Sequence, residues 1–232
     1  MTQPLRLHYA PDNASLIVRL ALEELGVSYE TFLVDRSLAA HRSDSYRAIN
    51  PAGKIPALET PHGPIFETAA ILLWLCDTYK GLAPAIEDAE RGAFVSWLFY
   101  LSNTMHANLR MTFYPKQYIA EPHRGALQAG ARENLRTSLS LLNDLAGQAH
   151  PWLNADTPSA LDLYLCAMLR WMALYPKGDT GWFTLADWPN LAAMTAKLDA
   201  RPSTAALCAA EGMTPHPFTA PKPPTPPEGS AL

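Results

Sequence analysis

The segment 50–56, Asn-Pro-Ala-Gly-Lys-Ile-Pro, strongly restricts the backbone that this chain can adopt. Proline at position 56 keeps Ile55 out of the helical region, so the backbone of Ile55 is extended. Its N–H and C=O groups can then pair with another extended chain. The Ile55–Pro56 bond also belongs to the one kind that adopts the cis form at low cost. A cis bond here would turn this backbone edge toward a cleft.

Glu67 and Thr68 follow a short distance along the chain, where Phe66 ends a strand pattern and an apolar helix pattern begins. A carboxylate, a hydroxyl and the unpaired N–H groups of a helix start would therefore converge on one place. This set suits a small zwitterionic peptide. The backbone edge at Ile55 would pair with the middle of the peptide. The carboxylate of Glu67 would bind the ammonium group of the peptide, and the hydroxyl of Thr68 with the helix N–H groups would bind its carboxylate.

Composition excludes several classes of protein. The chain has 232 residues, of which 48% are hydrophobic and 17% charged, which is typical of a folded globule of one or two domains. The net charge of −4 gives no electrostatic footprint for nucleic acid. The longest apolar run, residues 69–76, is far shorter than the roughly 20 residues of a membrane span. We therefore expect a cytoplasmic protein without a membrane or nucleic-acid partner.

Cysteine and histidine patterns predict neither disulfides nor a metal site. Cys76, Cys166 and Cys208 lie far apart in the sequence, each within an apolar helical pattern, so we expect buried structural side chains. The seven histidines are scattered, and none forms a convincing ligand pair with a neighbour at helical spacing.

The first third of the chain alternates strand and helix patterns. A strand–helix–strand order with a short connection predicts a parallel strand pair, and two strands joined by a turn then precede a helix. This βαβ-ββα order is that of a thioredoxin-like domain. The expected elements are strands at 5–9, 29–34, 56–59 and 65–66, helices at 14–25 and 68–79, and a short polar helix or loop at 41–49.

Strand patterns are absent from the rest of the chain, which predicts an all-helical second domain. Ser159 and Asp162 form a capping box ahead of an apolar helix that we expect to be deeply buried. The expected helices cover 88–113, 121–149, 159–174, 191–200 and 202–210. The predicted division is a domain at 1–82, a linker at 83–89, a helical domain at 90–212 and a proline-rich extended tail at 213–232.

This combination resembles the glutathione transferase superfamily over roughly residues 4–212, through the segment 50–56, Glu67-Thr68 and the capping box at 159–162. Locally it is similar to bacterial beta-class and theta-like members. Leu-His-Tyr-Ala-Pro at 7–11 is similar to the beta-class opening, and His41, Tyr46 and Asn50-Pro51 follow the theta-like pattern. The resemblance implies a thioredoxin-like domain followed by a helical bundle, glutathione as co-substrate without a metal, a homodimer and a role in detoxification.

The resemblance also implies a glutathione site. Ile55, ahead of a cis Pro56, would pair its backbone with the cysteinyl unit of glutathione. Glu67 and Thr68 would hold the γ-glutamyl end. Thr68 stands where the family usually has serine, but either hydroxyl can cap a helix start. The glycine carboxylate would be held by two further residues, His41 and Lys54.

The sequence departs from the family pattern at the start of the first helix. Beta-class members carry cysteine at the position of Ala14, and related enzymes often have serine or threonine at that of Ala10. Helix N–H groups with one side-chain hydrogen bond can lower a thiol pKa from about 8.5 toward neutrality. Asn13 or Ser15 could supply that bond as a catalytic residue, or could simply cap the helix. Asp12 as an anion would raise the pKa instead.

The second substrate is expected between the two domains, where small-molecule sites commonly form. His106, Arg110 and Tyr114 are spaced to share one helical face, and Met105-His106 resembles the beta-class Leu-His whose histidine faces the active site. We predict His106 as catalytic and Arg110, Tyr114, Met105 and Tyr9 as substrate-binding, on a surface suited to an anionic or polarisable electrophile. An interhelical hydrogen-bond network is the alternative.

The predicted function is conjugation of the glutathione thiolate to a small electrophile. Two alternatives stay open. One is a glutathione-dependent disulfide oxidoreductase or peroxidase that uses bound glutathione instead of its own cysteine. The other is a non-catalytic ligand-binding or interaction protein that keeps the fold.

Overall fold

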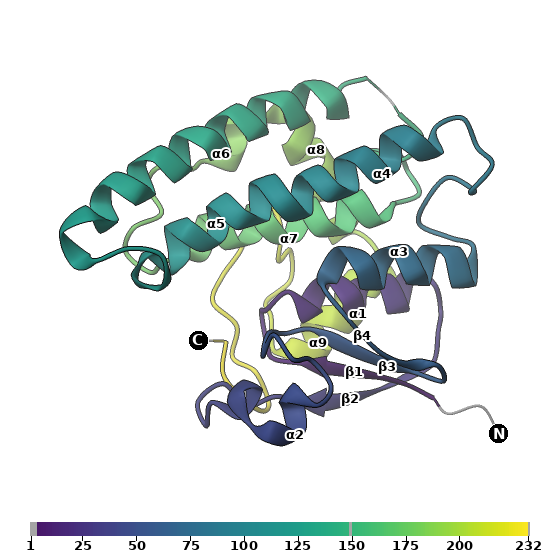
Figure 1. The fold of residues 1–232 in the computed structure, drawn as a ribbon. Helices are drawn as coiled ribbons and strands as arrows, with labels where there is room; N and C mark the ends of the chain where they lie inside the picture. Colours follow the sequence, from purple (N-terminus) through teal and green to yellow (C-terminus); the bar gives the residue numbers. More distant parts are fainter. Residues whose placement is uncertain (1–3, 149, 232) are drawn as a thin grey trace.

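The computed structural model describes residues 4–148 and 150–231. Residues 4–79 form a four-stranded sheet with helices on both sides, and we call them the thioredoxin-like half (Figure 1). The strand order is β2-β1-β3-β4. The elements are β1 (Leu5–Tyr9), α1 (Ser15–Glu24), β2 (Tyr29–Leu33), η1 (Ala40–Arg42), α2 (Asp44–Arg47), β3 (Ala57–Thr60), β4 (Gly63–Phe66) and α3 (Thr68–Tyr79).

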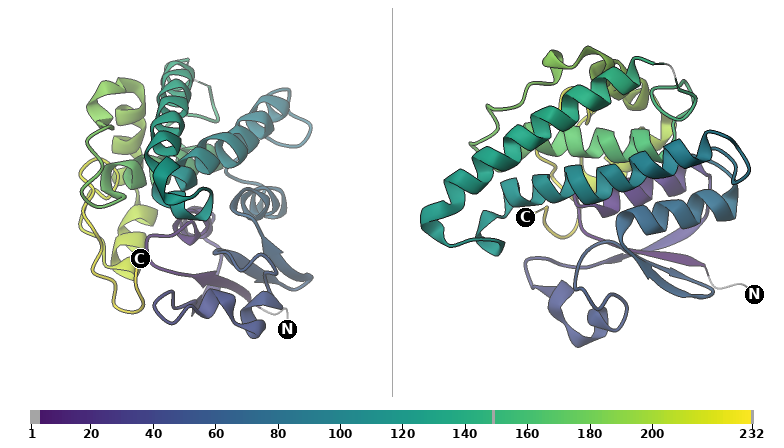
Figure 2. Two further views of the ribbon diagram at one scale, coloured as in Figure 1. Left: turned by 60° about the vertical axis from the view of Figure 1, so that its left-hand side comes forward. Right: turned by 45° about the horizontal axis from the view of Figure 1, so that its top comes forward.

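Sheet register confirms the predicted thioredoxin-like topology. Strand β1 runs parallel to β2, with Leu5 opposite Tyr29, and antiparallel to β3, with Leu7 opposite Leu58. Strands β3 and β4 form an antiparallel hairpin. Helices α1 and α3 lie on the side of the sheet that meets the rest of the molecule, and α2 lies on the opposite side (Figures 1 and 2). The sheet therefore presents its α1 and α3 layer to the second half.

Residues 91–211 form the helical half, where the expected helices are present. The expected helix 88–113 begins at Arg91 and is interrupted by a π-helical turn that separates α4 from α5. The other predicted helices are confirmed with small shifts at their ends, and position 149, the expected end of the helix from 121, lies outside the described residues. The elements are α4 (Arg91–Tyr100), η2 (Leu101–Met105), α5 (His106–Phe113), η3 (Pro115–Gln117), η4 (Glu121–His123), α6 (Arg124–Ala146), α7 (Ala160–Leu174), η5 (Leu185–Asp187), α8 (Pro189–Asp199) and α9 (Pro202–Glu211).

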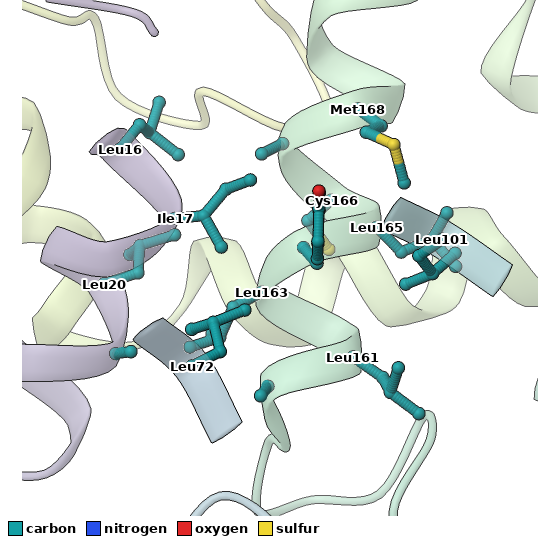
Figure 3. Packing of buried hydrophobic residues seen from close by; sticks show 14 of the residues in the cluster. Leu16, Ile17, Leu20, Leu72, Leu101, Leu161, Leu163, Leu165, Cys166 and Met168 are labelled. Carbon is teal, nitrogen blue, oxygen red and sulfur yellow. The ribbon is translucent and has the colours of Figure 1, made fainter. Parts of the chain in front are cut away.

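Helix α7 joins the two halves through a shared apolar core. Figure 3 shows Ile17 of α1 and Leu72 of α3 on one side of α7, with Leu101 of η2 on the other. All three are buried, as are Leu163 and Leu165 of α7 between them. Burying one such aliphatic side chain stabilises a fold by about 1.5–3 kcal/mol. The two halves are thus held together mainly by this continuous core.

The capping box that begins α7 is confirmed. The Ser159 backbone N–H donates to Asp162 Oδ2 at 2.8 Å, and the Leu161 N–H donates to Ser159 Oγ at 3.0 Å. These bonds satisfy N–H groups that a buried helix start would otherwise leave without partners.

Residues 213–231 contain no helix or strand, but they pack closely on the molecule. Phe218 is 1% exposed, and Asp199 of α8 accepts the backbone N–H groups of Phe218 and Thr219, each at 3.0 Å. In Figure 1 this segment, in yellow, descends to the level of α2 and then turns back toward the junction of the halves. The segment is therefore an integral outer layer of the fold.

Cysteine side chains lie away from solvent. Cys76 and Cys166 are buried, Cys208 is half-buried, and all three are free thiols. Burial raises the pKa of Cys76 to about 12, which makes its thiolate scarce at neutral pH. Over the described ranges, no helix combines the length and apolar character needed to cross a membrane.

Candidate active site

A cavity of about 530 Å³ lies between the two halves. Its wall on the thioredoxin-like side comes from the start of α1, the loop before β3 and the start of α3. The opposite wall comes from η2, α5 and the C-terminal part of α7. The cavity therefore forms where the segment 50–56 and the face of α5 were predicted to meet.

The Ile55–Pro56 peptide is cis, as expected, and both residues line the cavity. Asn50 Nδ2 and the Tyr46 hydroxyl both donate to the backbone carbonyl of Lys54, at 2.7 and 2.6 Å. This carbonyl is thus held from two sides, which orients the backbone of the next residue. Gly53 is required nearby, because it has a φ of +58° and an added Cβ would lie 2.9 Å from the His41 carbonyl oxygen.

Glu67 and Thr68 lie at the start of α3 and also line the cavity. Glu67 has a φ of 71°, an uncommon conformation for a residue other than glycine, and its side chain makes no capping bond. The first N–H groups of α3 have no partner within the helix. A carboxylate, a hydroxyl and helix N–H groups are therefore arranged together beside the cis peptide.

Asn13 and Ala14 line the cavity at the start of α1, but Ser15 does not. Ser15 is fully buried; its hydroxyl donates to the Ala10 carbonyl at 3.0 Å and accepts the Ala10 N–H at 3.2 Å. Both bonds hold the turn before α1, so the predicted catalytic role of Ser15 is not supported. Asn13 Nδ2 donates to the carbonyls of Pro11 at 2.9 Å and Ala231 at 3.4 Å.

Asp12 is the center of a buried network that the sequence analysis missed. Its carboxylate accepts two bonds from Arg170, at 2.9 and 3.0 Å, one from Trp171 Nε1 at 3.0 Å and one from the Tyr175 hydroxyl at 2.7 Å. Its backbone N–H donates to Glu211 at 2.8 Å. The side chains of Asp12 and Arg170 are both 0% exposed. The sequence signal for this network is Arg170 inside the apolar run of α7, because a buried charge needs a buried partner.

This network changes the role expected of Asp12 near a thiol. Asp12 alone, as an anion, would raise the thiol pKa, but the guanidinium of Arg170 compensates its charge. Burial, followed by the charge of Asp12, raises the pKa of the Tyr175 hydroxyl well above its usual value. Tyr175 therefore stays protonated and serves Asp12 as a donor.

His106 lines the opposite wall, with its Nδ1 2.9 Å from the Tyr164 hydroxyl. Its ring centroid lies 5.7 Å from that of Trp171. Burial, helped by the charge of Arg110, lowers the pKa of His106 to about 4. The imidazole is therefore neutral at neutral pH.

Arg110 and Tyr114 line the cavity with His106, so the face predicted from helical spacing is confirmed. Met105 instead lies in the core at 0% exposure and does not line the cavity. Tyr9 is 3% exposed within β1, and its hydroxyl donates to Glu228. The predicted substrate contacts of Met105 and Tyr9 are therefore not supported.

His41 also lies outside the cavity lining, whereas Lys54 is part of it. Burial, followed by the charges of Arg42, Arg36 and other nearby cations, lowers the pKa of His41. A neutral imidazole away from the cavity wall is a poor partner for a carboxylate. Among residues 4–148 and 150–231 there is no cluster of three or more His, Cys, Asp or Glu side chains that could hold a metal ion.

A thioredoxin-like half followed by a helical half, with a cis-proline edge in the cavity between them, is the architecture of the glutathione transferase fold. The family model for the glutathione S-transferase N-terminal domain matches residues 14–78, and that for the C-terminal domain matches residues 124–193. The chain belongs to the glutathione S-transferase family.

Individual relatives agree with this assignment. Glutathione S-transferase GST-4.5 of Xanthomonas campestris is 29% identical over 172 residues, which are 72% of this chain and 82% of the relative. The solved structure of a glutathione transferase from Methylococcus capsulatus is 30% identical, with a TM-score of 0.74, over 90% of this chain and 98% of that one. A sphingomonad glutathione S-transferase complexed with glutathione is 29% identical, with a TM-score of 0.74, over 90% and 100% of the two chains.

Proposed function

We propose that this protein is a glutathione transferase that joins the thiol of glutathione to a small electrophile. The observation that carries the proposal is the meeting of the cis Ile55–Pro56 edge and the Glu67–Thr68 helix start in one cavity, opposite the aromatic and basic wall of the helical half. The sphingomonad relative, solved with glutathione, supports this ligand.

Each part of glutathione has a matching group in the proposed site. The extended backbone of Ile55 pairs with the cysteinyl unit, and the Lys54 ammonium attracts the glycine carboxylate. The Glu67 carboxylate binds the ammonium of the γ-glutamyl end, whose carboxylate meets the Thr68 hydroxyl and the first N–H groups of α3. Neutral His106, held by Tyr164, offers a hydrogen bond to the electrophile.

The start of α1 lowers the pKa of the glutathione thiol and so activates it. Its first N–H groups favour a thiolate by charge and by hydrogen bonding. Asn13 can add a bond by exchanging its 3.4 Å contact with the Ala231 carbonyl for the sulfur. The sulfur then attacks the electrophilic carbon. A leaving group departs with the bonding electrons or, for an activated alkene, the new carbanion takes up the proton released by the thiol.

Glutathione titration by isothermal calorimetry tests the binding site. Thr68→Val should weaken binding about tenfold, because it removes one hydrogen bond to a charged group. Thr137→Val is the control, since Thr137 is exposed on α6 and does not line the cavity. Absence of binding to the unmodified protein would overturn the proposal and leave the non-catalytic alternative.

Substrate turnover separates the two enzymatic alternatives. None of the described lining residues is a cysteine, so a disulfide reaction would have to use the thiol of bound glutathione. Conjugation of an aryl halide, together with ultraviolet absorbance of a thiolate near neutral pH, is the expected result. Turnover of a disulfide without conjugation would favour the oxidoreductase. The homodimer, the domain boundaries, the cytoplasmic location and the role in detoxification stay predictions.

A further inference from the structure

The cavity lining contains more positive than negative charge. Among the described residues of the lining, four are cations, Arg36, Lys54, Arg110 and Lys177, and two are carboxylates, Asp12 and Glu67. Asp12 is already paired with Arg170, so of these two carboxylates Glu67 remains to balance the four cations. Within the described part of the chain, none of the four cations forms an ion pair with a carboxylate. The positive charge of these side chains is therefore available to a bound anion.

Two of these cations, Arg36 and Arg110, approach Tyr114 from opposite halves. Arg36 follows β2, and its Nη2 lies 3.5 Å from the Tyr114 hydroxyl. Arg110 lies on α5, with the central carbon of its guanidinium 6.0 Å from the center of the Tyr114 ring. Together they form what we call the arginine pair, with the tyrosine between them.

Neutral groups hold the arginine pair in place and leave its charge uncompensated. Arg36 Nη1 donates to the Ala231 carbonyl at 2.9 Å. Arg110 donates to the Tyr118 hydroxyl at 3.3 Å and to Gln117 Oε1 at 3.4 Å. Both side chains are partly buried, so water screens them less than it screens an exposed arginine. Ordered guanidinium groups that already have an orientation bind an anion at lower entropic cost.

The positive charge of the arginine pair also acts on Lys54. Burial and then the positive charges of Arg110, Arg42 and Arg36 lower the pKa of its ammonium group. The positive potential thus extends from the loop before β3 across the cavity to α5. The proposed glutathione site uses Lys54, Glu67 and Thr68 and has no need of Arg110 on the far wall.

Aromatic side chains lie beside the arginine pair. Phe113 and Tyr175 both line the cavity, with ring centers 6.2 Å apart and nearly perpendicular planes. Trp171 lines the same wall. These rings offer an apolar surface to a flat substrate, and the arginine pair lies at its edge.

From this arrangement we propose, on the basis of the proposed function, that the second substrate is an electrophile with an aromatic or unsaturated body and an anionic group such as a carboxylate. The anionic group binds Arg110 and Arg36 and accepts a hydrogen bond from the Tyr114 hydroxyl. The body lies against Phe113 and Trp171. Arg110 and Arg36 are therefore the residues that determine specificity for the second substrate.

Two inert product analogues test the proposal without turnover. S-benzylglutathione and S-(para-carboxybenzyl)glutathione differ only in one carboxylate, and calorimetry gives the dissociation constant of each. The unmodified protein should bind the carboxylated analogue about tenfold more tightly, the value of one good charge-assisted contact. Arg110→Gln should abolish this preference while changing the affinity for S-benzylglutathione by less than about twofold.

Lys116→Gln is the matched control, because Lys116 is close in sequence and exposed but does not line the cavity. It should leave the preference intact, which separates a direct contact from a general loss of positive charge. Arg36→Gln is the second, independent variant and should reduce the preference as well. Thermal unfolding of each variant shows whether it is folded.

Three results would contradict the proposal, and each has a different meaning. Equal binding of the two analogues by the unmodified protein overturns the anionic substrate and leaves the glutathione site standing. Equal weakening of both analogues by Arg110→Gln shows that Arg110 contacts glutathione itself. Binding of neither analogue overturns the proposed function and this inference with it.

Discussion

Asp12 and Arg170 form a fully buried charge pair that also touches the candidate site. The pair is tolerated because the carboxylate accepts four hydrogen bonds and because Arg170 also donates to the carbonyls of Pro217 and Lys222, each at 3.0 Å. Asp12 has a φ of 51°, so this pair also holds the unusual turn before α1. The pair thus connects the start of α1, helix α7 and the C-terminal segment.

Removing one member of this pair should be costly. Arg170→Met leaves the Asp12 charge buried without a cation, and we expect a loss of about 3–5 kcal/mol in the free energy of unfolding. Urea unfolding measures it. Arg136→Met is the control, since Arg136 pairs with Glu133 on the exposed face of α6. The double variant Asp12→Asn with Arg170→Met should recover part of the loss. A single-variant loss close to that of the control would disprove this account.

His106 should make stability depend on pH. Its pKa lies near 4 in the folded protein, below its ordinary value of 6.5, so protonation favours the unfolded chain. The stability from neutral His106 is complete above about pH 6.5 and is lost as the pH falls toward about 4. Urea unfolding across this range should show a shallower fall for His106→Gln. His62→Gln, at an exposed turn, should keep the original slope.

Among the elements, the π-helical turn η2 is the feature of the predicted helix 88–113 that apolar spacing did not indicate. Its sequence, Leu-Ser-Asn-Thr-Met, is compatible with a continuous helix by apolar spacing. Its last residue, Met105, lies in the core, while His106, the first residue of α5, lines the cavity. Such turns are frequent at functional sites. The turn packs against α6 and α7, and contacts between such distant segments are not visible in a local pattern.

Helix α7 depends on its first residue. Ser159→Ala removes the cap of α7 and the bond from Ser159 Oγ to the Trp152 carbonyl at 2.6 Å. We expect a loss of about 1–2 kcal/mol in the free energy of unfolding. Ser43→Ala should cost less, because Ser43 caps the exposed four-residue helix α2. Equal losses in urea unfolding would show that the buried capping box stabilises the fold no more than the exposed cap at Ser43.

At the scale of the whole molecule, residues 213–231 close the structure on the outside. The segment reaches α8 through Asp199, α7 through Arg170, β1 through Tyr9 and the cavity through Ala231. It therefore connects both halves, although its sequence resembles a loose proline-rich tail. The position of Arg36 in the arginine pair depends on this segment, because Arg36 donates a hydrogen bond to the Ala231 carbonyl.

Phe218 anchors this segment in the core. Phe218→Ala should lower the free energy of unfolding by about 3 kcal/mol or more, because it leaves a cavity at a fully packed site. Phe99→Ala is the control, since Phe99 is 45% exposed on α4. Calorimetric or urea unfolding compares them. A loss for Phe218→Ala no larger than that for Phe99→Ala would mean that the segment is only loosely attached.

The parts predicted well are those that neighbouring residues encode. Strand β1, helix α3 and the capping box at Ser159 were located correctly because alternation, helical spacing and capping act over a few residues. The cis bond at Pro56 belongs to the same group. For His106, Arg110 and Tyr114, helical periodicity was enough to place all three on the cavity wall.

Contacts between distant segments account for the rest. Ser15 was a reasonable candidate from its place at a helix start, but only the folded turn shows its hydroxyl bound to Ala10. The pairing of Asp12 with Arg170 spans 158 positions in the chain. The sequence by itself determined the fold and the peptide edge, since these rest on local backbone preference and periodic burial, and it indicated the family through the resemblance of its motifs. Only the tertiary structure decided which polar side chains are paired within the protein. It also decided which of them, like Arg36 and Arg110, carry a charge that no carboxylate of the described residues pairs and that is left for the proposed substrate.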